Sequence, residues 1–317
     1  MTVEAVESAL ALLSSQAAVS PSSSYAVMMP PIVMPMHVAV DATPVAVKAA
    51  DGGAYFLKLY APDMLRFIDV GAAIAASRAA GALGIGPVVV ADDVGAGAIL
   101  FEALPANSWR MASRQDLRSP DVLAAILQAK RAWHQSPALA RTRSPFETIR
   151  AYLQELDELG EAAGAPPSFA QLRAWIEAAE QAFAIAGGDL APLHGENVIS
   201  NVMLGPGDQV KLVDFDQAAN GDPYYDLGAF CIEGCSFVDE VEAFVSLYLG
   251  KADKRALART LAYMVVDDFL WGCWGLIAQA TSPRAGGVEF YKYAQNRFIR
   301  CQYWLSLTDF DQVLRDL

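Results

Sequence analysis

The sequence predicts an α+β protein in which a small antiparallel sheet with one helix precedes a mostly α-helical part. Three observations support this class. β-like apolar runs are concentrated before residue 104, helical periodicity dominates after Pro105, and one short hairpin interrupts the helical part. A chain of 317 residues is long enough for two domains. We place the boundary after residue 104, which gives an N-terminal domain at 1–104 and a helical domain at 105–317.

Composition favours a soluble globular protein. Hydrophobic residues make up 54% of the chain and charged residues 19%, which indicates a packed core rather than disorder. The uncharged stretch at 8–40 is long enough to cross a bilayer, but its prolines and serines argue against a transmembrane helix, so we expect no membrane insertion. The N-terminus carries two acids and no base, unlike a signal peptide, and a cytoplasmic location is expected.

Net charge argues against a nucleic-acid-binding protein, and the cysteine and histidine content argues against a zinc-cluster protein. With 23 basic and 36 acidic residues the net charge is −13, which repels nucleic acid and attracts cationic small molecules. No CxxC pair occurs and the chain has only three histidines, so a zinc cluster lacks ligands. The cysteines are expected to be buried thiols: Cys231, Cys235, Cys273 and Cys301.

The N-terminal domain combines a leading helix with short strands. Helical periodicity predicts a helix over Val3–Ser14, and an Ala-rich run predicts another over 70–83. Alternating apolar runs bounded by Gly and Pro predict the strands. These runs lie at 32–40, 44–50, 54–60, 87–92 and 98–104, with Asp51-Gly52-Gly53 as the hairpin turn between the second and third.

The helical domain contains a single β interruption. Helices are predicted at 121–134, 146–159 and 168–186, and several more follow from residue 223 to the end. The segments NVML (201–204) and VKLVDF (210–215) are joined by Gly205-Pro206-Gly207-Asp208 and predict a hairpin.

Polar motifs frame this hairpin. HGENVISN (194–201) precedes it, VDFD (213–216) ends it, and GDPYYDL (221–227) follows. An acid on a loop can accept a hydroxyl proton, and an Asn and an Asp at the hairpin end suit Mg²⁺, which prefers oxygen ligands. The motifs therefore gather an acid, an Asn and an Asp around one hairpin.

This pattern resembles the catalytic core of the aminoglycoside phosphotransferase and choline/ethanolamine kinase superfamily. The resemblance implies a two-lobed, protein-kinase-like fold that binds ATP and Mg²⁺ between the lobes. Carried over by position, Asn201 and Asp214 would be the metal ligands, and Glu196 stands where the family has its catalytic aspartate. Glutamate places the carboxylate about 1 Å further out, and a shift of that size costs roughly 10²-fold in rate.

The resemblance also implies a strand lysine that binds the ATP phosphates. Lys58 in FLKLY follows the Gly turn and matches best, while Lys48 in VAVK is the rival. The turn expected to cradle the phosphates, at 41–44, has no glycine. No Glu occurs from residue 55 to 100 to pair with the lysine, so its usual helix partner is missing or replaced, with Asp69 as a candidate. The resemblance places Glu102 at the hinge that contacts adenine through backbone groups, and a merely exposed side chain is the alternative.

The C-terminal third resembles the choline/ethanolamine kinase branch in FLWGCWGLIAQA and VEFYKYAQNRF. In that branch two tryptophans, a tyrosine and an acid surround a quaternary ammonium, where cation–π attraction replaces water. The matching residues for substrate binding are Trp271, Trp274, Tyr293 and Glu233. Ordinary helix core remains the alternative for the Trp pair, and Asp267 and Asp268 fit either a pocket or a helix surface.

Three functions remain open at this point. The first is a small-molecule kinase whose acceptor is a cationic alcohol such as choline or ethanolamine. The second is a phosphotransferase for another hydroxylated acceptor, such as an aminoglycoside or a sugar. The third is a degenerate kinase-fold protein that binds without turnover. The Met-rich run at 28–36 leaves a homodimer contact, a lid or core packing open, with core as the default.

Overall fold

The computed structural model describes residues 3–16, 24–28, 40–50, 52–196 and 198–317. The chain divides into two compact units. Unit 1 comprises residues 1–133 and 200–218, and unit 2 comprises 134–199 and 219–317. The hairpin segment thus joins the unit that contains the N-terminal sheet. The division into two lobes after residue 104 stays a prediction.

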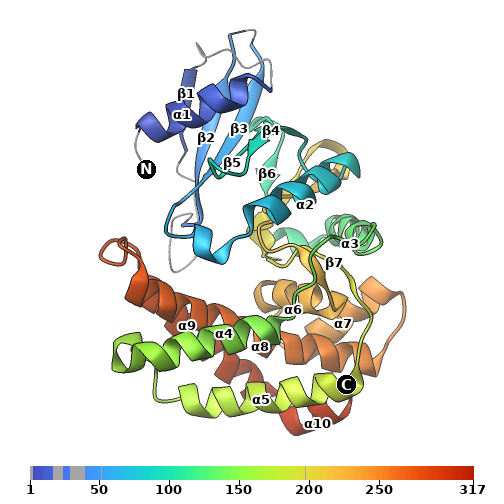
Figure 1. Cartoon of the computed structure of the whole chain (residues 1–317). Coiled ribbons are helices and arrows are strands. Elements are labelled where there is room, and N and C mark those ends of the chain that lie inside the picture. Colours follow the sequence, from blue (N-terminus) through green and yellow to red (C-terminus); the bar gives the residue numbers. More distant parts are fainter. Residues whose placement is uncertain (1–2, 17–23, 29–39, 51, 197) are drawn as a thin grey trace. The chain divides into compact units, whose positions relative to one another are not determined.

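Unit 1 is built on a sheet of five antiparallel strands in the order β1-β2-β3-β5-β4 (Figure 1). These strands are β1 (Ser24–Val27), β2 (Ala42–Lys48), β3 (Ala54–Tyr60), β4 (Val89–Asp93) and β5 (Ala98–Glu102). The central strand is β3, which pairs with β2 and β5. Successive side chains of a strand point to opposite faces, so Leu57 and Leu59 share one face while Lys58 and Tyr60 share the other.

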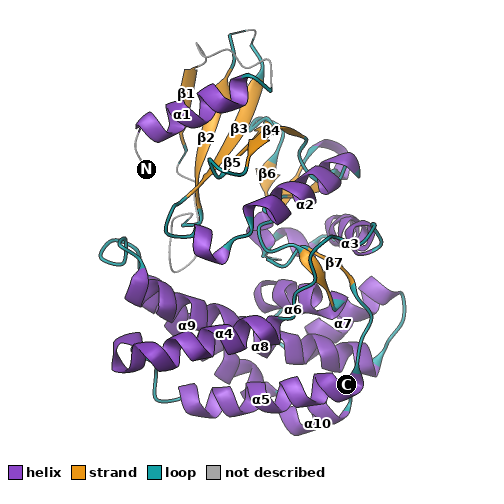
Figure 2. Cartoon of the chain, viewed as in Figure 1, coloured by secondary structure: helices purple, strands orange, loops and turns teal. Residues whose placement is uncertain are grey.

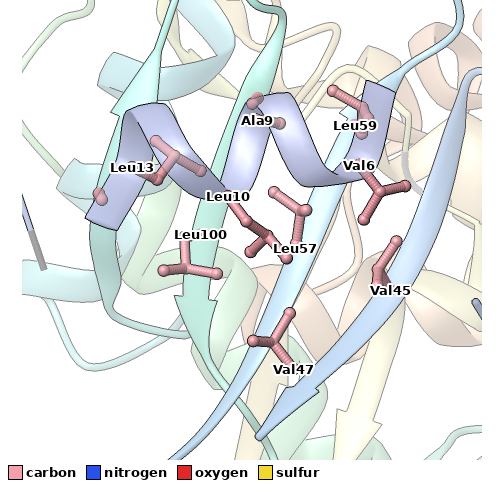
Figure 3. Packing of buried hydrophobic residues seen from close by; sticks show 11 residues of the cluster. Val6, Ala9, Leu10, Leu13, Val45, Val47, Leu57, Leu59 and Leu100 are labelled. Carbon is pink, nitrogen blue, oxygen red and sulfur yellow. The ribbon is translucent and has the colours of Figure 1, made fainter. Parts of the chain in front are cut away.

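The helix α1 (Val3–Ser14) covers the face of the sheet that carries Leu57 and Leu59 (Figure 3). A helix of 12 residues is marginal alone, so packing must hold it in place. Its buried residues recur with helical spacing and meet buried residues of four strands. The helix contributes Val6, Ala9, Leu10 and Leu13, and the strands contribute Val45, Val47, Leu57, Leu59, Ala91, Ala98 and Leu100.

Leu13→Ala is expected to lower the free energy of unfolding by about 3 kcal/mol, because a fully buried leucine is replaced by a cavity. Leu12 is the matched control, since it precedes Leu13 on the same helix and is 51% exposed. Equilibrium denaturation of both variants measures the effect. Equal losses for Leu12→Ala and Leu13→Ala would contradict the packing of α1 on the sheet.

The described part of unit 1 also contains two α-helices and a three-stranded sheet. The helices are α2 (Val70–Ala82) and α3 (Pro120–His134), and the last residue of α3, His134, belongs to unit 2. The strands are β6 (Arg110–Met111), β8 (Val202–Leu204) and β9 (Val210–Leu212). The loop after α2 is tied to β9. Lys211 Nζ donates to the carbonyls of Gly84 (3.1 Å) and Gly86 (2.9 Å), and Leu212 N donates to Ile85 O.

Unit 2 is almost entirely helical (Figure 2). Its elements are α4 (Pro145–Leu159), α5 (Phe169–Ala186), β7 (Ala191–Leu193), β10 (Ala219–Gly221), α6 (Pro223–Gly234), α7 (Val238–Leu249), α8 (Lys254–Thr281), α9 (Phe290–Leu307) and α10 (Phe310–Arg315). By length and hydropathy α8 alone among the described helices could cross a membrane, but 94% of its apolar window is buried in protein. It packs against α4, α6 and α9, which makes it the core helix of this unit.

The predicted α+β class is confirmed, as are the helix over Val3–Ser14 and the strand at 54–60. The phosphate turn predicted at 41–44 is wrong, because residues 42–44 lie inside β2 and pair with β3. The sequence between β1 and β2, at 28–41, also lacks glycine, and its residues 29–39 lie outside the described residues. The strand predicted at 32–40, except for Val40, and most of the Met-rich run lie outside the described residues.

Candidate active site

Asn201 and Asp214 lie at one end of the β8–β9 hairpin. The two strands pair antiparallel, with Val202 opposite Leu212. One more bond extends this ladder, because Val213 N donates to Asn201 O at 2.9 Å. The two predicted metal ligands are therefore close neighbours in unit 1.

Asp214 has an unusual backbone conformation. Its φ of 72° is in the left-handed region, which non-glycine residues seldom adopt, although Asp tolerates it better than most. Among the described residues only Asp208, at the turn of the same hairpin, is another non-glycine residue with positive φ. The Asp214 side chain is 32% exposed. Local strain is retained most often where it serves a site, and here it presents an accessible carboxylate.

Lys58 reaches these acids from β3. Its ammonium contacts Asp214 and lies 2.6 Å from Asp216 Oδ2. Burial disfavours the charged form, yet the two carboxylates hold the pKa of Lys58 well above its ordinary value. The rival Lys48 is exposed at the end of β2. Lys58 is therefore the lysine that meets the acids of the VDFD motif.

The carboxylates of Asp214 and Asp216 share the single positive charge of Lys58, so that charge neutralises only one of the two negative charges. Burial, with the charge of Asp214, raises the pKa of Asp216. Tyr60 stabilises the same carboxylate, because its hydroxyl donates to Asp216 Oδ1 at 2.6 Å. Neither Asp216 nor Tyr60 was among the predicted site residues. The pattern Lys-Leu-Tyr was the available signal, since it puts Lys58 and Tyr60 on one face of a strand.

Asp69 has a different role from the one considered for it. Its side chain accepts a hydrogen bond from Ala72 N at 3.0 Å and caps the N-terminus of α2. The partner of Lys58 therefore comes from the VDFD motif and not from the start of this helix.

In unit 2 the loop that carries Glu196 is held by a buried acid. Asp226 is 0% exposed and accepts from His194 N (2.7 Å) and Gly195 N (2.9 Å). His134 Nε2 lies 3.0 Å from the same carboxylate. Gly195 has a φ of 81°, which a side chain would strain. These contacts fix the backbone just before Glu196.

Glu196 is half-buried, and its charge is felt at Tyr293. Burial raises the pKa of Tyr293, Arg297 opposes this shift, and the carboxylate of Glu196 adds to it. The predicted catalytic acid and one of the predicted acceptor-binding residues are thus within electrostatic range inside one unit.

The predicted aromatic residues are in contact with one another. Trp271 and Trp274 pack edge to face with centroids 5.5 Å apart, and Trp274 meets Tyr293 in the same way at 5.7 Å. Trp274 is only 2% exposed and Tyr293 7%, whereas Trp271 is half-buried. The contact of Trp271 with Trp274, which their spacing predicted, is therefore confirmed, and Trp271 is the more accessible ring.

The acids one turn before the Trp pair are not surface residues. Arg297 Nη1 lies 2.9 Å from Asp268 and 3.4 Å from Asp267, and Arg300 also pairs with Asp268. The Arg297 guanidinium lies 4.9 Å from the centroid of the Tyr293 ring. Burial raises the pKa of Asp267 to about 6, although Arg297 opposes the shift. The two acids are thus paired with Arg297, which contacts the Tyr293 ring, and Asp268 pairs with Arg300 as well.

The two remaining predicted residues have different surroundings. Glu233 Oε2 accepts from Ile199 N at 2.8 Å, so one of its oxygens positions the backbone of the segment after Glu196. Glu102 ends β5 with an exposed side chain, and its N donates to Val88 O at 2.9 Å. Their roles in substrate and cofactor binding stay predictions.

Comparisons with known proteins address the fold and the family. Among solved structures, a choline/ethanolamine kinase family protein from Mesorhizobium loti has a TM-score of 0.79 and 21% identity, covering 100% of this chain and 99% of that one. Choline kinase LicA from Streptococcus pneumoniae has a TM-score of 0.70 and 19% identity over 83% of this chain and 89% of that one. An ethanolamine kinase from Plasmodium vivax has a TM-score of 0.72 and 17% identity, covering 90% of this chain and 84% of that one. These likenesses confirm the protein-kinase-like fold.

No curated protein matches the sequence. The model of the phosphotransferase enzyme family matches residues 38–261, which is most of the chain and includes the hairpin with its flanking motifs. The resemblance inferred from those motifs is therefore confirmed: the chain belongs to the phosphotransferase enzyme family, and its class of activity is ATP-dependent phosphoryl transfer.

Proposed function

We propose that this phosphotransferase passes the γ-phosphoryl group of ATP to the hydroxyl of a cationic amino alcohol of the choline or ethanolamine type. The observation that carries the proposal is the packing of Trp271, Trp274 and Tyr293 against one another. The negative charge of Glu196 contributes to the raised pKa of Tyr293. An aromatic surface beside an acid suits an ammonium group. An acid on a fixed loop suits the neighbouring hydroxyl.

The residues of unit 1 fit a divalent cation. The side chains of Asn201 and Asp214 offer oxygen ligands at one hairpin end, and the accessible Asp214 carboxylate already pairs with a cation, the Lys58 ammonium. We propose Mg²⁺ there, held by Asn201 and Asp214. Bound Mg²⁺ would neutralise charge on the phosphates of ATP.

Other residues of the chain would bind the nucleotide and the acceptor. Lys58 would neutralise phosphate charge from β3, and Glu102 would place the hinge backbone near adenine. Glu196 would orient the acceptor hydroxyl and accept its proton. Trp271 would contact the cationic head most directly, since it is the accessible ring of its cluster. Glu233 would add negative charge while its bond to Ile199 holds the loop.

A second acceptor class follows from a specific observation. Trp274 and Tyr293 are nearly fully buried, and Trp274 also packs on Phe290 at 5.7 Å. Such packing is equally typical of a helix core, in which case the acceptor would be another hydroxylated molecule, such as an aminoglycoside or a sugar. An acceptor panel separates the two classes.

The test is ATP consumption with Mg²⁺ across choline, ethanolamine, a dimethylated amino alcohol, aminoglycosides and sugars. We expect turnover with the amino alcohols, and we expect Trp271→Ala to raise the KM for the acceptor about tenfold or more without changing the KM for ATP. Trp175→Ala is the matched control, because Trp175 is also half-buried in unit 2 and packs edge-on against Phe310.

Other outcomes would redirect the proposal. Turnover with aminoglycosides or sugars alone would favour the second acceptor class. No turnover with any acceptor, in a protein that binds ATP, would favour a binding protein. We also propose a cytoplasmic location, because the four cysteines are buried and form no disulfide in the described structure, and disulfides are rare in that compartment.

A further inference from the structure

We propose that Asp216 and Tyr60 form a clamp that positions Lys58 for the nucleotide phosphates. This inference rests on the phosphate-binding role of Lys58 in the proposed function. The clamp would replace a helix glutamate, because the sequence of α2 contains no carboxylate and Asp69 is engaged in capping it. It consists of two residues, Asp216 and Tyr60, which belong to unit 1 together with Lys58.

Each oxygen of the Asp216 carboxylate has its own partner. Oδ1 accepts from the Tyr60 hydroxyl and Oδ2 pairs with Lys58 Nζ, both at 2.6 Å. The Asp216 side chain is 5% exposed, against 32% for Asp214. This contrast separates the roles of two acids that are two residues apart. Asp214 is accessible to a metal ion, whereas the Asp216 carboxylate is buried and bound to Tyr60 and Lys58.

Tyr60 holds the lysine in a second way. It lies two residues after Lys58 on β3, so both side chains point to the same face of the sheet. The Lys58 ammonium is 4.9 Å from the centroid of the Tyr60 ring. Tyr60 is itself only 3% exposed. Ordering a lysine side chain costs conformational entropy. These contacts would order Lys58 before the nucleotide binds, so nucleotide binding would not have to offset that loss.

The segment that carries Asp216 is anchored independently of Lys58. Phe215 lies between the two acids, is 2% exposed, and packs edge to face on Trp133 with centroids 4.9 Å apart. Trp133 belongs to α3 and is fully buried. The anchor fixes where Asp216 stands, so Asp216 can set the position of the more flexible lysine.

Tyr60→Phe tests the clamp, since it removes only the hydroxyl that supports Asp216. We expect the affinity for ADP to fall about tenfold, the usual effect of losing a hydrogen bond to a charged group. Tyr263→Phe is the matched control. Its hydroxyl donates to Asp222 Oδ2 at 3.2 Å, and Asp222 also pairs with Arg259 Nε at 2.9 Å, so the same type of Tyr–Asp–cation set is disturbed in unit 2.

Calorimetric titration with ADP, in Mg²⁺ and again in chelator, is the measurement. An ADP affinity of Tyr60→Phe within about twofold of wild type would overturn the clamp. Should Tyr60→Phe not fold, Asp216→Asn in chelator takes its place, because no role of Asp216 as a metal ligand enters there. An unchanged affinity of that variant would also overturn the clamp.

The same titration distinguishes this inference from the proposed function. A wild-type protein that binds ADP but phosphorylates no acceptor would contradict the proposed function and leave the clamp to be decided by the variants. A wild-type protein that binds no nucleotide, or one whose ADP affinity Lys58→Met does not alter, would overturn the clamp itself.

Discussion

Asp214→Asn is expected to lower kcat by about 10³-fold, because it removes the accessible carboxylate that would hold Mg²⁺ against the phosphates. Asparagine is the informative replacement. Like aspartate it tolerates the left-handed region, so the φ of 72° adds little strain, whereas alanine would add some. The measurement is acceptor-dependent ATP consumption over a range of Mg²⁺ concentrations.

The hairpin itself offers the control for this prediction. Asp208 is also an aspartate with positive φ, at 62°, but it lies exposed at the opposite end, in the turn. Asp208→Asn is therefore expected to retain wild-type turnover. Similar small losses in both variants would show that the metal is held elsewhere. A loss at Asp214→Asn that excess Mg²⁺ restores would show a role in metal affinity alone.

Local patterns predicted the elements whose residues carry their own signal. The helix over Val3–Ser14 has helical spacing of apolar residues, and the strand at 54–60 follows a glycine turn, so both were located correctly. The strands β1, β6, β7 and β10 were missed. They have two to four residues each, and β7 contains Pro192. Such short strands exist because distant segments pair with them, which no local pattern shows.

The same distinction applies to the candidate site. The motifs identified Asp214 and Lys58 separately, and the structure brings them together. The partner that completes the site, Asp216, is 156 residues from Tyr60 in sequence, so a search for a glutamate on the neighbouring helix could not find it. Helical spacing predicted the contact of Trp271 with Trp274. It did not predict how deeply Trp274 is buried, because α9 supplies the residues that cover it.

The second large effect is expected at Glu196, which stands where the family pattern has an aspartate. Glu196→Gln keeps the length of the side chain and removes its charge, and it is expected to lower kcat by about 10²- to 10³-fold with little change in the KM for ATP. Glu161→Gln, at an exposed glutamate of unit 2, serves as the control. Initial rates at saturating ATP and acceptor measure the effect.

Glu196→Asp distinguishes a loop adapted to glutamate from one that merely tolerates it. Asp226 fixes the backbone at His194 and Gly195, so the loop cannot readily advance to compensate for a shorter side chain. The carboxylate would then retreat by about 1 Å, and kcat should fall roughly 10²-fold although the charge is kept. A gain in kcat would mean that the acceptor is placed for an aspartate. Full activity of Glu196→Gln would mean that positioning and charge neutralisation by Lys58 and the metal suffice without a base, because the loose transition state of phosphoryl transfer requires little proton removal.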